Sequence, residues 1–175
     1  MDRHLQYVRT MPTEKHLDQA FDAALRENPH FFAWFVAKLR RGAAYPKWHW
    51  SRANYAWGKV KLLLPNPSTG ALEAVWREGE TDILVVLEGS TGERLGVHIE
   101  NKRAGGSFTP YQPDVCAARA EAWLGQAKYE NYQEWETVLL SPRSFYDRNT
   151  PEVRKFTTFV PHEDVALWLP VFAKA

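Results

Sequence analysis

The pattern of apolar residues near the middle of the chain predicts a β-hairpin. Residues 81–87 are mostly apolar and rich in β-branched side chains, which is typical of a strand buried on both faces. The sequence from Gly89 to Gly92 has the composition of a turn, and a second strand is expected over 94–102. Because side chains alternate along a strand, His98, Glu100 and Lys102 should share one of its faces.

A turn centred on Thr91, with a glycine in the left-handed position, determines which residues face one another across this hairpin. In this register Asp82 lies opposite Glu100, with their Cβ atoms about 4.5–5.5 Å apart. Two carboxylates this close repel each other unless a divalent cation lies between them or one of them is protonated. Lys102 points to the same side, so the hairpin assembles the groups needed for metal-assisted phosphodiester hydrolysis. A slip of one residue would turn Asp82 to the opposite face.

The flanking sequence predicts an α/β domain. Apolar residues recur with helical spacing over four segments, 13–27, 29–40, 112–128 and 162–169. Further strand candidates are 59–64, 71–77, 136–141 and 156–160. A helix separates the second strand of the hairpin from the strand predicted over 136–141. These two strands should therefore pair in parallel. We therefore expect a mixed sheet of about five strands with helices on both faces.

Residues 43–58 combine aromatic and basic side chains and are expected to form a loop. Trp48, Trp50 and Arg52 belong to this segment, and side chains of these types can stack on bases and bind phosphates. Alternatively, the segment wraps the sheet and buries its tryptophans in the core. If it is exposed instead, it is the best candidate for contact with a nucleic acid or a partner protein.

At the hairpin and the helix after it, the chain resembles the PD-(D/E)XK nuclease superfamily. Asp82 matches the acid of the first motif, although threonine and not proline precedes it. Glu100, Asn101 and Lys102 match the (D/E)XK tripeptide, and Gln112 matches the glutamine that many members carry at the start of the next helix. The resemblance is sharp over about 79–125 and implies a restriction-endonuclease-like fold.

The resemblance also implies a nuclease that depends on Mg²⁺ or Mn²⁺ and acts on nucleic acid, with DNA as the favoured substrate. Asp82, Glu100 and the backbone carbonyl of Asn101 would hold the metal. Lys102 would orient the attacking water or offset charge that develops on the phosphate, and Gln112 would position substrate or water. Glu80 and His98 are candidates for the layer around the metal, and Arg103 is a candidate nucleic-acid contact. The superfamily often places one more acid on an early helix, and the candidates for it are Glu14, Asp18, Asp22 and Glu27. For His98, packing or a hydrogen bond is the alternative role.

Composition adds few limits. The 175 residues fit one domain, 1–175, and a net charge of +1 does not exclude a nuclease whose basic residues gather in one cleft. No apolar run is long enough to span a membrane, and residues 1–12 lack the apolar core of a secretory signal. Cys116 is the only cysteine, so we expect no disulfide and a cytoplasmic protein, with Cys116 itself a small buried hydrophobe.

Two other functions fit the same residues. One is a catalytically inactive nuclease fold that binds nucleic acid or protein, and the other is hydrolysis of a different phosphoester, such as a nucleotide. Cutting both strands of a duplex at one site usually requires two active sites, so a homodimer is compatible with the nuclease hypothesis.

Overall fold

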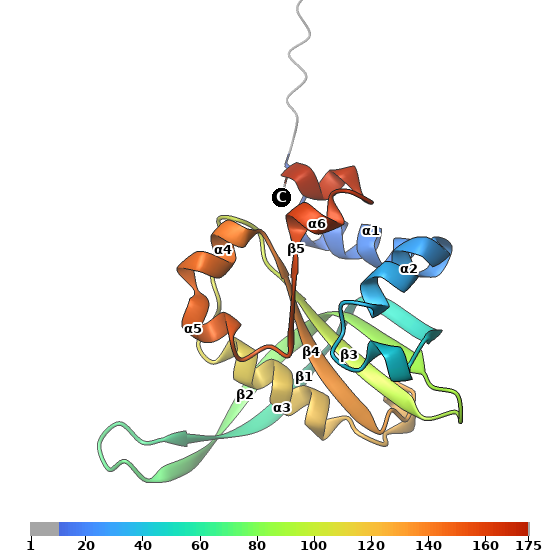
Figure 1. The fold of residues 1–175 in the computed structure, drawn as a ribbon. Coiled ribbons are helices and arrows are strands. Elements are labelled where there is room, and N and C mark those ends of the chain that lie inside the picture. Colours follow the sequence, from blue (N-terminus) through green and yellow to red (C-terminus); the bar gives the residue numbers. More distant parts are fainter. Residues whose placement is uncertain (1–10, 175) are drawn as a thin grey trace, which may run out of the picture.

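A five-stranded mixed sheet forms the centre of the molecule, in the spatial order β1-β2-β3-β4-β5 (Figure 1). The structure is a computed structural model that describes residues 11–174, without the side chains of 55–57. The expectation about a secretory signal therefore concerns residues that lie mostly outside the described part. The strands are β1 (Lys47–Pro65), β2 (Leu72–Glu88), β3 (Arg94–Asn101), β4 (Glu134–Ser141) and β5 (Thr158–Pro161).

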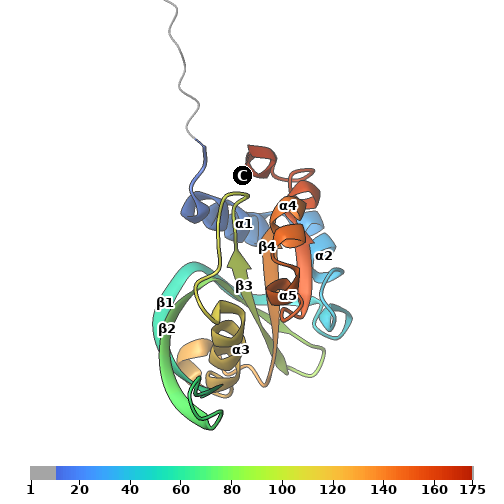
Figure 2. The same cartoon turned by 90° about the vertical axis from the view of Figure 1, so that its left-hand side faces the viewer.

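Helices cover both faces of this sheet, which confirms the predicted α/β class (Figures 1 and 2). One face packs on α1 (Glu14–Glu27) and α2 (Pro29–Val36), and the other packs on α3 (Gln112–Ala122). The remaining short helices are α4 (Arg143–Arg148), α5 (Thr150–Val153) and α6 (His162–Val165). Within the described part of the chain, no helix has the length and apolar character needed to cross a bilayer.

The register of the central hairpin is the predicted one. Ile83 pairs with Ile99 and Leu84 pairs with His98 in the antiparallel ladder between β2 and β3. Odd-numbered residues of both strands, such as Ile83 and Ile99, enter the core under α1 and α2, whereas Leu84 packs against the layer that contains Trp123. Both faces of the hairpin are thus buried, as the apolar run 81–87 indicates. The next strand, β4, pairs with β3 in parallel, as predicted from the intervening helix.

The first strand differs most from the prediction. Residues 47–65 form one long strand, so most of the segment expected to be a loop is part of β1. Its pairing with β2 is interrupted by irregularities between Trp48 and Trp50 and between Tyr55 and Gly58. Such bulges shift the alternation of side chains, so the two-residue period that identifies a strand is lost in the sequence.

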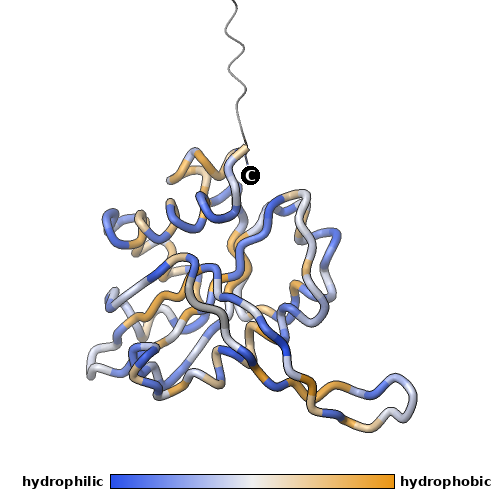
Figure 3. The backbone as a smooth tube through the Cα atoms, turned by 180° about the vertical axis from the view of Figure 1, so that it is seen from behind, coloured by the Kyte–Doolittle hydropathy of each residue, from blue (hydrophilic) through white to orange (hydrophobic). Residues whose placement is uncertain are grey.

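The second strand is also longer than expected. The two segments predicted over 71–77 and 81–87 are parts of a single strand, β2, which passes through Gly79 without a break. The outer parts of β1 and β2 form a two-stranded ribbon that projects from the body (Figures 1 and 3). A Cβ on Gly79 would lie 2.2 Å from Nη2 of Arg119, so glycine here admits a neighbouring side chain and does not mark a turn.

Several helices are shorter than predicted. The second ends at Val36 and not near residue 40, and α3 ends at Ala122 and not near residue 128. Gly125, with a φ of 66°, takes the chain away from the end of α3. The C-terminal helix α6 spans only His162–Val165, and α4 and α5 lie between the predicted strands 136–141 and 156–160, where no helix was predicted. Such short helices carry too few turns for a 3.6-residue pattern to be recognised.

The close packing of Gly96 against Tyr132 gives a test of this fold. A Cβ on Gly96 would lie 2.7 Å from Cγ and Cδ1 of the buried Tyr132 ring. We expect Gly96→Ala to lower the free energy of unfolding by about 1–3 kcal/mol, as overpacking of a core does. Chemical denaturation would measure this change. Gly105→Ala is the matched control, because nothing lies within 4 Å of its Cβ position, and an equal loss in both variants would contradict the packing described.

Candidate active site

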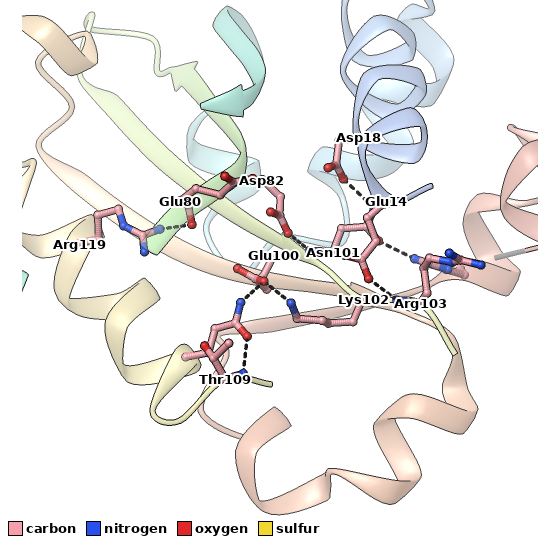
Figure 4. Close-up of polar contacts among 12 residues, drawn as sticks. Glu14, Asp18, Glu80, Asp82, Glu100, Asn101, Lys102, Arg103, Thr109 and Arg119 are labelled. Atoms are coloured by element: carbon pink, nitrogen blue, oxygen red, sulfur yellow. Dashed lines mark hydrogen bonds and ion pairs between the residues drawn. The ribbon is translucent and has the colours of Figure 1, made fainter. Parts of the chain in front are cut away.

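Four of the predicted catalytic side chains line one cavity. Asp82 comes from β2, Glu100 from β3 and Lys102 from the residue that follows β3 (Figure 4). Gln112 comes from the first turn of α3. The cavity has a volume of about 600 Å³, which is typical of a small-ligand pocket. The hairpin register places Asp82 and Glu100 on one face of the sheet, and the connection from β3 into α3 brings Gln112 over that face.

Glu100 contacts two other predicted catalytic side chains at the cavity. Only 3% of the residue is exposed, and its Oε1 accepts a hydrogen bond from Nε2 of Gln112 and lies 2.8 Å from Nζ of Lys102. The orientation of the Gln112 amide is fixed, because its Oε1 accepts a hydrogen bond from the backbone N–H of Thr109, at 3.0 Å. Residues 109–112 also fit a capping box with Gln112 at the third helical position, but α3 begins at Gln112 and Tyr111 is its N-cap, so this prediction is wrong. The helix start and the site therefore share one side chain.

Asp82 makes a different kind of contact. Its Oδ2 accepts a hydrogen bond of 2.7 Å from the backbone N–H of Asn101, the residue between Glu100 and Lys102. Burial raises the pKa of Asp82 well above its ordinary value, and repulsion from Glu100 and Asp18 raises it further. Burial likewise raises the pKa of Glu100, against the lowering effects of Lys102 and of a hydrogen bond with Asp82. Two carboxyl groups in contact and withdrawn from water thus bind protons more tightly than ordinary carboxyl groups do.

Lys102 keeps its charge despite its burial. Burial alone would favour the neutral amine, but the adjacent Glu100 carboxylate outweighs it, so the pKa of Lys102 is raised. The residue is 9% exposed and remains a hydrogen-bond donor at neutral pH. It can therefore contact an anion in the cavity but cannot act as a general base in this state.

The charges of the cavity lining favour a cation. Five carboxylates line it, from Glu14, Glu78, Glu80, Asp82 and Glu100, against three basic side chains, from Arg77, Lys102 and Arg119, a formal charge of −2. Among the described residues, no group of three or more His, Cys, Asp or Glu side chains is arranged to hold a metal ion. Two carboxylates, a backbone carbonyl and water nevertheless fit Mg²⁺, which usually keeps several waters and binds one or two carboxylates together with a substrate phosphate.

A buried hydrogen-bond chain fixes α3 to the hairpin. Nη1 of Arg119 donates to the backbone carbonyl of Glu80 and to Oγ1 of Thr81, the latter at 2.9 Å. Thr81 lies 3.3 Å from Nδ1 of His98, and Nε2 of His98 lies 3.0 Å from the hydroxyl of Tyr132. Because the Tyr132 hydroxyl donates to the carbonyl of Ala120, it accepts from His98, which places the histidine proton on Nε2.

These hydrogen bonds determine the role of His98. Burial lowers its pKa to about 3, with Arg119 adding to the effect, so the ring is neutral. Both ring nitrogens are engaged by Thr81 and Tyr132 and are not available to a metal. The sequence-based candidate role of His98 near the metal is therefore replaced by a structural one. Glu80, the other candidate for that layer, does line the cavity, and its backbone carbonyl accepts from Arg119.

A second buried network holds the tripeptide from the opposite face. The side-chain amide of Asn101 donates to Oδ1 of Asp18 at 2.7 Å, and its Oδ1 lies 2.8 Å from Nε2 of His162. Of the four acids considered on the first helix, Asp18 thus supports the tripeptide and Glu14 lines the cavity. Asp22 instead accepts a hydrogen bond from Ser51 and Glu27 is exposed, so neither belongs to the site.

Three of the predicted nucleic-acid contacts lie elsewhere. Trp48, Trp50 and Arg52 pair with residues 84–87 of β2, toward the turn of the hairpin, and none of them lines the cavity. Trp50 packs against the cluster around Trp123, whereas Trp48 remains 41% exposed. Arg103 is closer to the site, because it lines a smaller cavity of about 320 Å³ that shares Glu14 with the main one.

Two basic residues of the cavity lining and one tyrosine beside it were not predicted as site residues. Arg77 and Arg119 line the cavity, and Tyr111 precedes Gln112 at the start of α3. For Arg119 a signal exists in the sequence, since it falls on the apolar face of α3, between Val115 and Trp123 at helical spacing. An arginine at a core position must have buried partners. Nothing in the sequence distinguishes Arg77 or Tyr111 from surface residues.

Comparisons of the chain with protein-family models, with curated proteins and with solved structures found no match. The functional argument therefore rests on the geometry and chemistry of the cavity.

The raised pKa values at the site predict how stability depends on pH in the absence of metal. Burial raises the pKa of Asp18 from 3.8 to about 7, and that of Asp82 is also raised. Because these carboxyls bind protons more tightly in the folded state, their favourable contribution is lost as pH rises through the folded values. His98 and His162 have lowered pKa values in the folded state, so their effect is to reduce stability as the pH falls below about 6.5.

We therefore expect the protein in EDTA to lose more stability than the Asp82→Asn variant as the pH rises through neutrality, because that variant lacks the carboxyl with the raised pKa. Mn²⁺ should restore this loss at the higher pH, because the cation replaces the proton. Thermal denaturation with and without Mn²⁺ would measure both effects. Asp82→Asn is the comparison, since an amide oxygen can still accept from the Asn101 N–H. If that variant responds to pH and metal as the unaltered protein does, Asp82 is not the group concerned.

Proposed function

We propose that the protein is a divalent-metal-dependent nuclease that hydrolyses phosphodiester bonds, with DNA as the favoured substrate. One observation carries this proposal: Asp82, Glu100, Lys102 and Gln112 come from three separate stretches of the chain and meet in one cavity. These are the positions that resemble the motifs of the PD-(D/E)XK superfamily. The mixed sheet with helices on both faces supports the same restriction-endonuclease-like assignment.

Asp82, Glu100 and the backbone carbonyl of Asn101 would hold Mg²⁺ or Mn²⁺. When bound, such a cation polarises the scissile phosphate and lowers the pKa of a coordinated water. The formal charge of −2 on the cavity lining means that a phosphate would be repelled without a cation. Cation binding and substrate binding are therefore coupled in this proposal, and the substrate should bind weakly without the cation.

The chain's own residues supply positioning and charge. Lys102 is protonated and can donate a hydrogen bond to a phosphate oxygen, so it stabilises negative charge that grows in the transition state. Gln112 holds the Glu100 carboxylate in place while Thr109 fixes its amide. The contact from the Asn101 N–H orients Asp82, and the Asp18 and His162 contacts fix Asn101 in turn. The reactive groups are thus held by partners on both faces of the sheet.

The proposal extends to the setting in which the enzyme works. A nuclease with a single cysteine and no disulfide is consistent with the cytoplasm. A homodimer would be required only for cutting both strands of a duplex at one site.

The central test is cleavage of plasmid DNA, of linear duplex DNA and of single-stranded DNA in Mg²⁺ or Mn²⁺. We expect Lys102→Ala to reduce the cleavage rate by about 10²–10³-fold or more, the usual effect of removing one group that stabilises transition-state charge. Lys38→Ala is the matched control, because Lys38 lies beyond α2 over the Trp34 ring. It should cleave at the unaltered rate, and thermal denaturation would verify that both variants are folded.

Equal cleavage by the unaltered protein and by Lys102→Ala would mean that a contaminating nuclease is responsible. No cleavage by the unaltered protein with either cation, together with no change in stability on adding Mn²⁺, would favour the alternative of an inactive nuclease fold that binds nucleic acid or protein.

A further inference from the structure

Tyr111 adopts an unfavourable backbone conformation beside the candidate active site. Its φ is 62° and its ψ is 19°, in the left-handed region that bulky residues seldom occupy. The conformation costs an L-residue about 1–2 kcal/mol, and glycine or asparagine adopts it more readily. The next residue, Gln112, is the one whose amide contacts Glu100. The strained position is therefore one residue away from the reactive groups.

The local fold does not account for the tyrosine ring. The side chain of Tyr111 makes no capping hydrogen bond to α3, although it occupies the N-cap position. It is 43% exposed, and its hydroxyl has no hydrogen bond within the part of the chain that is described. Glycine would satisfy the backbone here without strain. A ring kept at this position despite that strain indicates a role outside the packing of the domain.

Arg77 joins this ring to the cavity. The guanidinium carbon of Arg77 lies 5.8 Å from the centroid of the Tyr111 ring, within the range of a cation–π contact. Arg77 belongs to β2, where the projecting ribbon leaves the body, and its side chain lines the cavity that holds Asp82 and Glu100. An exposed aromatic ring and a cation are thus paired at the edge of the candidate active site.

We infer that Arg77 and Tyr111 form a binding site for an unpaired nucleotide of the substrate, with the base on the Tyr111 ring and a phosphate on Arg77. This inference rests on the proposed nuclease function and specifies its substrate as single-stranded nucleic acid. Aromatic rings accept any base by stacking, but a base inside a duplex has both of its faces covered by its neighbours. Arginine binds phosphate through its planar array of donors.

The depth of the reactive groups supports the same substrate class. Glu100 and Lys102 are only 3% and 9% exposed, so they lie at the floor of the cavity and not on an open surface. A phosphate of a flexible single strand can enter such a cavity, whereas a phosphate of a duplex is held at the surface of a wide, stiff rod.

Binding can be measured apart from cleavage. Fluorescence anisotropy would follow a short fluorescein-labelled oligonucleotide in Mn²⁺, as single-stranded DNA, as single-stranded RNA and as duplex DNA. The Lys102→Ala protein serves as the parent, so that cleavage does not interfere. Three variants are compared in that background. Tyr111→Gly removes both the ring and the strain, Tyr111→Phe keeps the ring, and Trp48→Ala removes an exposed ring outside the cavity.

We expect the parent to bind single strands more tightly than duplex, and Tyr111→Gly to weaken single-strand binding by about 5- to 150-fold, the usual effect of losing one stacked base. Tyr111→Phe and Trp48→Ala should bind like the parent. Thermal denaturation should show Tyr111→Gly to be at least as stable as the parent, because glycine suits the left-handed backbone. A preference for DNA over RNA, or the reverse, would identify which single strand the site takes.

Unchanged binding by Tyr111→Gly would overturn the inference, as would tighter binding of duplex than of single strands. A loss of stability in Tyr111→Gly that matches its loss of binding would show that the ring is structural. Weakened binding in Trp48→Ala alone would assign the contact to the surface near the hairpin turn. Binding that depends on Tyr111 in a protein that cleaves nothing would refute the nuclease function but leave the nucleotide site standing. Normal cleavage by the unaltered protein, with no effect of Tyr111→Gly on binding, would refute the nucleotide site but leave the nuclease function standing.

Discussion

Two carboxyl groups withdrawn from water at the open end of a hairpin determine the organisation around them. Asp82 and Glu100 meet because the turn between β2 and β3 has one particular length. Burying like charges side by side is unfavourable, so each must find compensation nearby. Glu100 finds it in Lys102 and Gln112, and Asp82 in the Asn101 N–H. These contacts offset only part of the cost of burying two negative charges, as the raised pKa values of both acids indicate. A bound cation would offset the remainder.

Holding such a site requires support from both layers of helices. On the α3 side, the hydrogen bonds of Arg119 and His98 reach the hairpin one or two residues from Asp82 and Glu100. On the α1 side, Asp18 and His162 form hydrogen bonds with the Asn101 side chain, which points away from the cavity. The end of β3 is thereby fixed through consecutive residues that face opposite ways. Because a strand alternates its side chains, one short tripeptide can be reactive on one face and anchored on the other.

Most of the site could be predicted from the sequence, but less of the fold. The hairpin register follows from local turn chemistry, and it alone determines that Asp82 and Glu100 meet. The contact between the Thr109 N–H and the Gln112 amide oxygen is local as well. The long first strand could not be predicted, because its irregular pairing near Trp48 and Gly58 conceals the alternation. Its existence depends on hydrogen bonds to β2, which are a property of the assembled sheet.

The contrast between Trp48 and Tyr111 shows which kind of observation identifies a contact residue. Trp48 and Trp50 attract attention because tryptophan beside basic residues is conspicuous, yet Trp50 mainly serves the packing of the second core layer. Aromatic side chains are abundant in this chain, so the presence of one does not by itself tell whether it packs in the core or binds a ligand. Tyr111 is unremarkable in composition, but its backbone is strained and its ring is exposed. A residue that contributes little to packing and carries a conformational cost is the stronger candidate, and the contact described for the Tyr111 ring, with Arg77, lies at the edge of the cavity and not in the core.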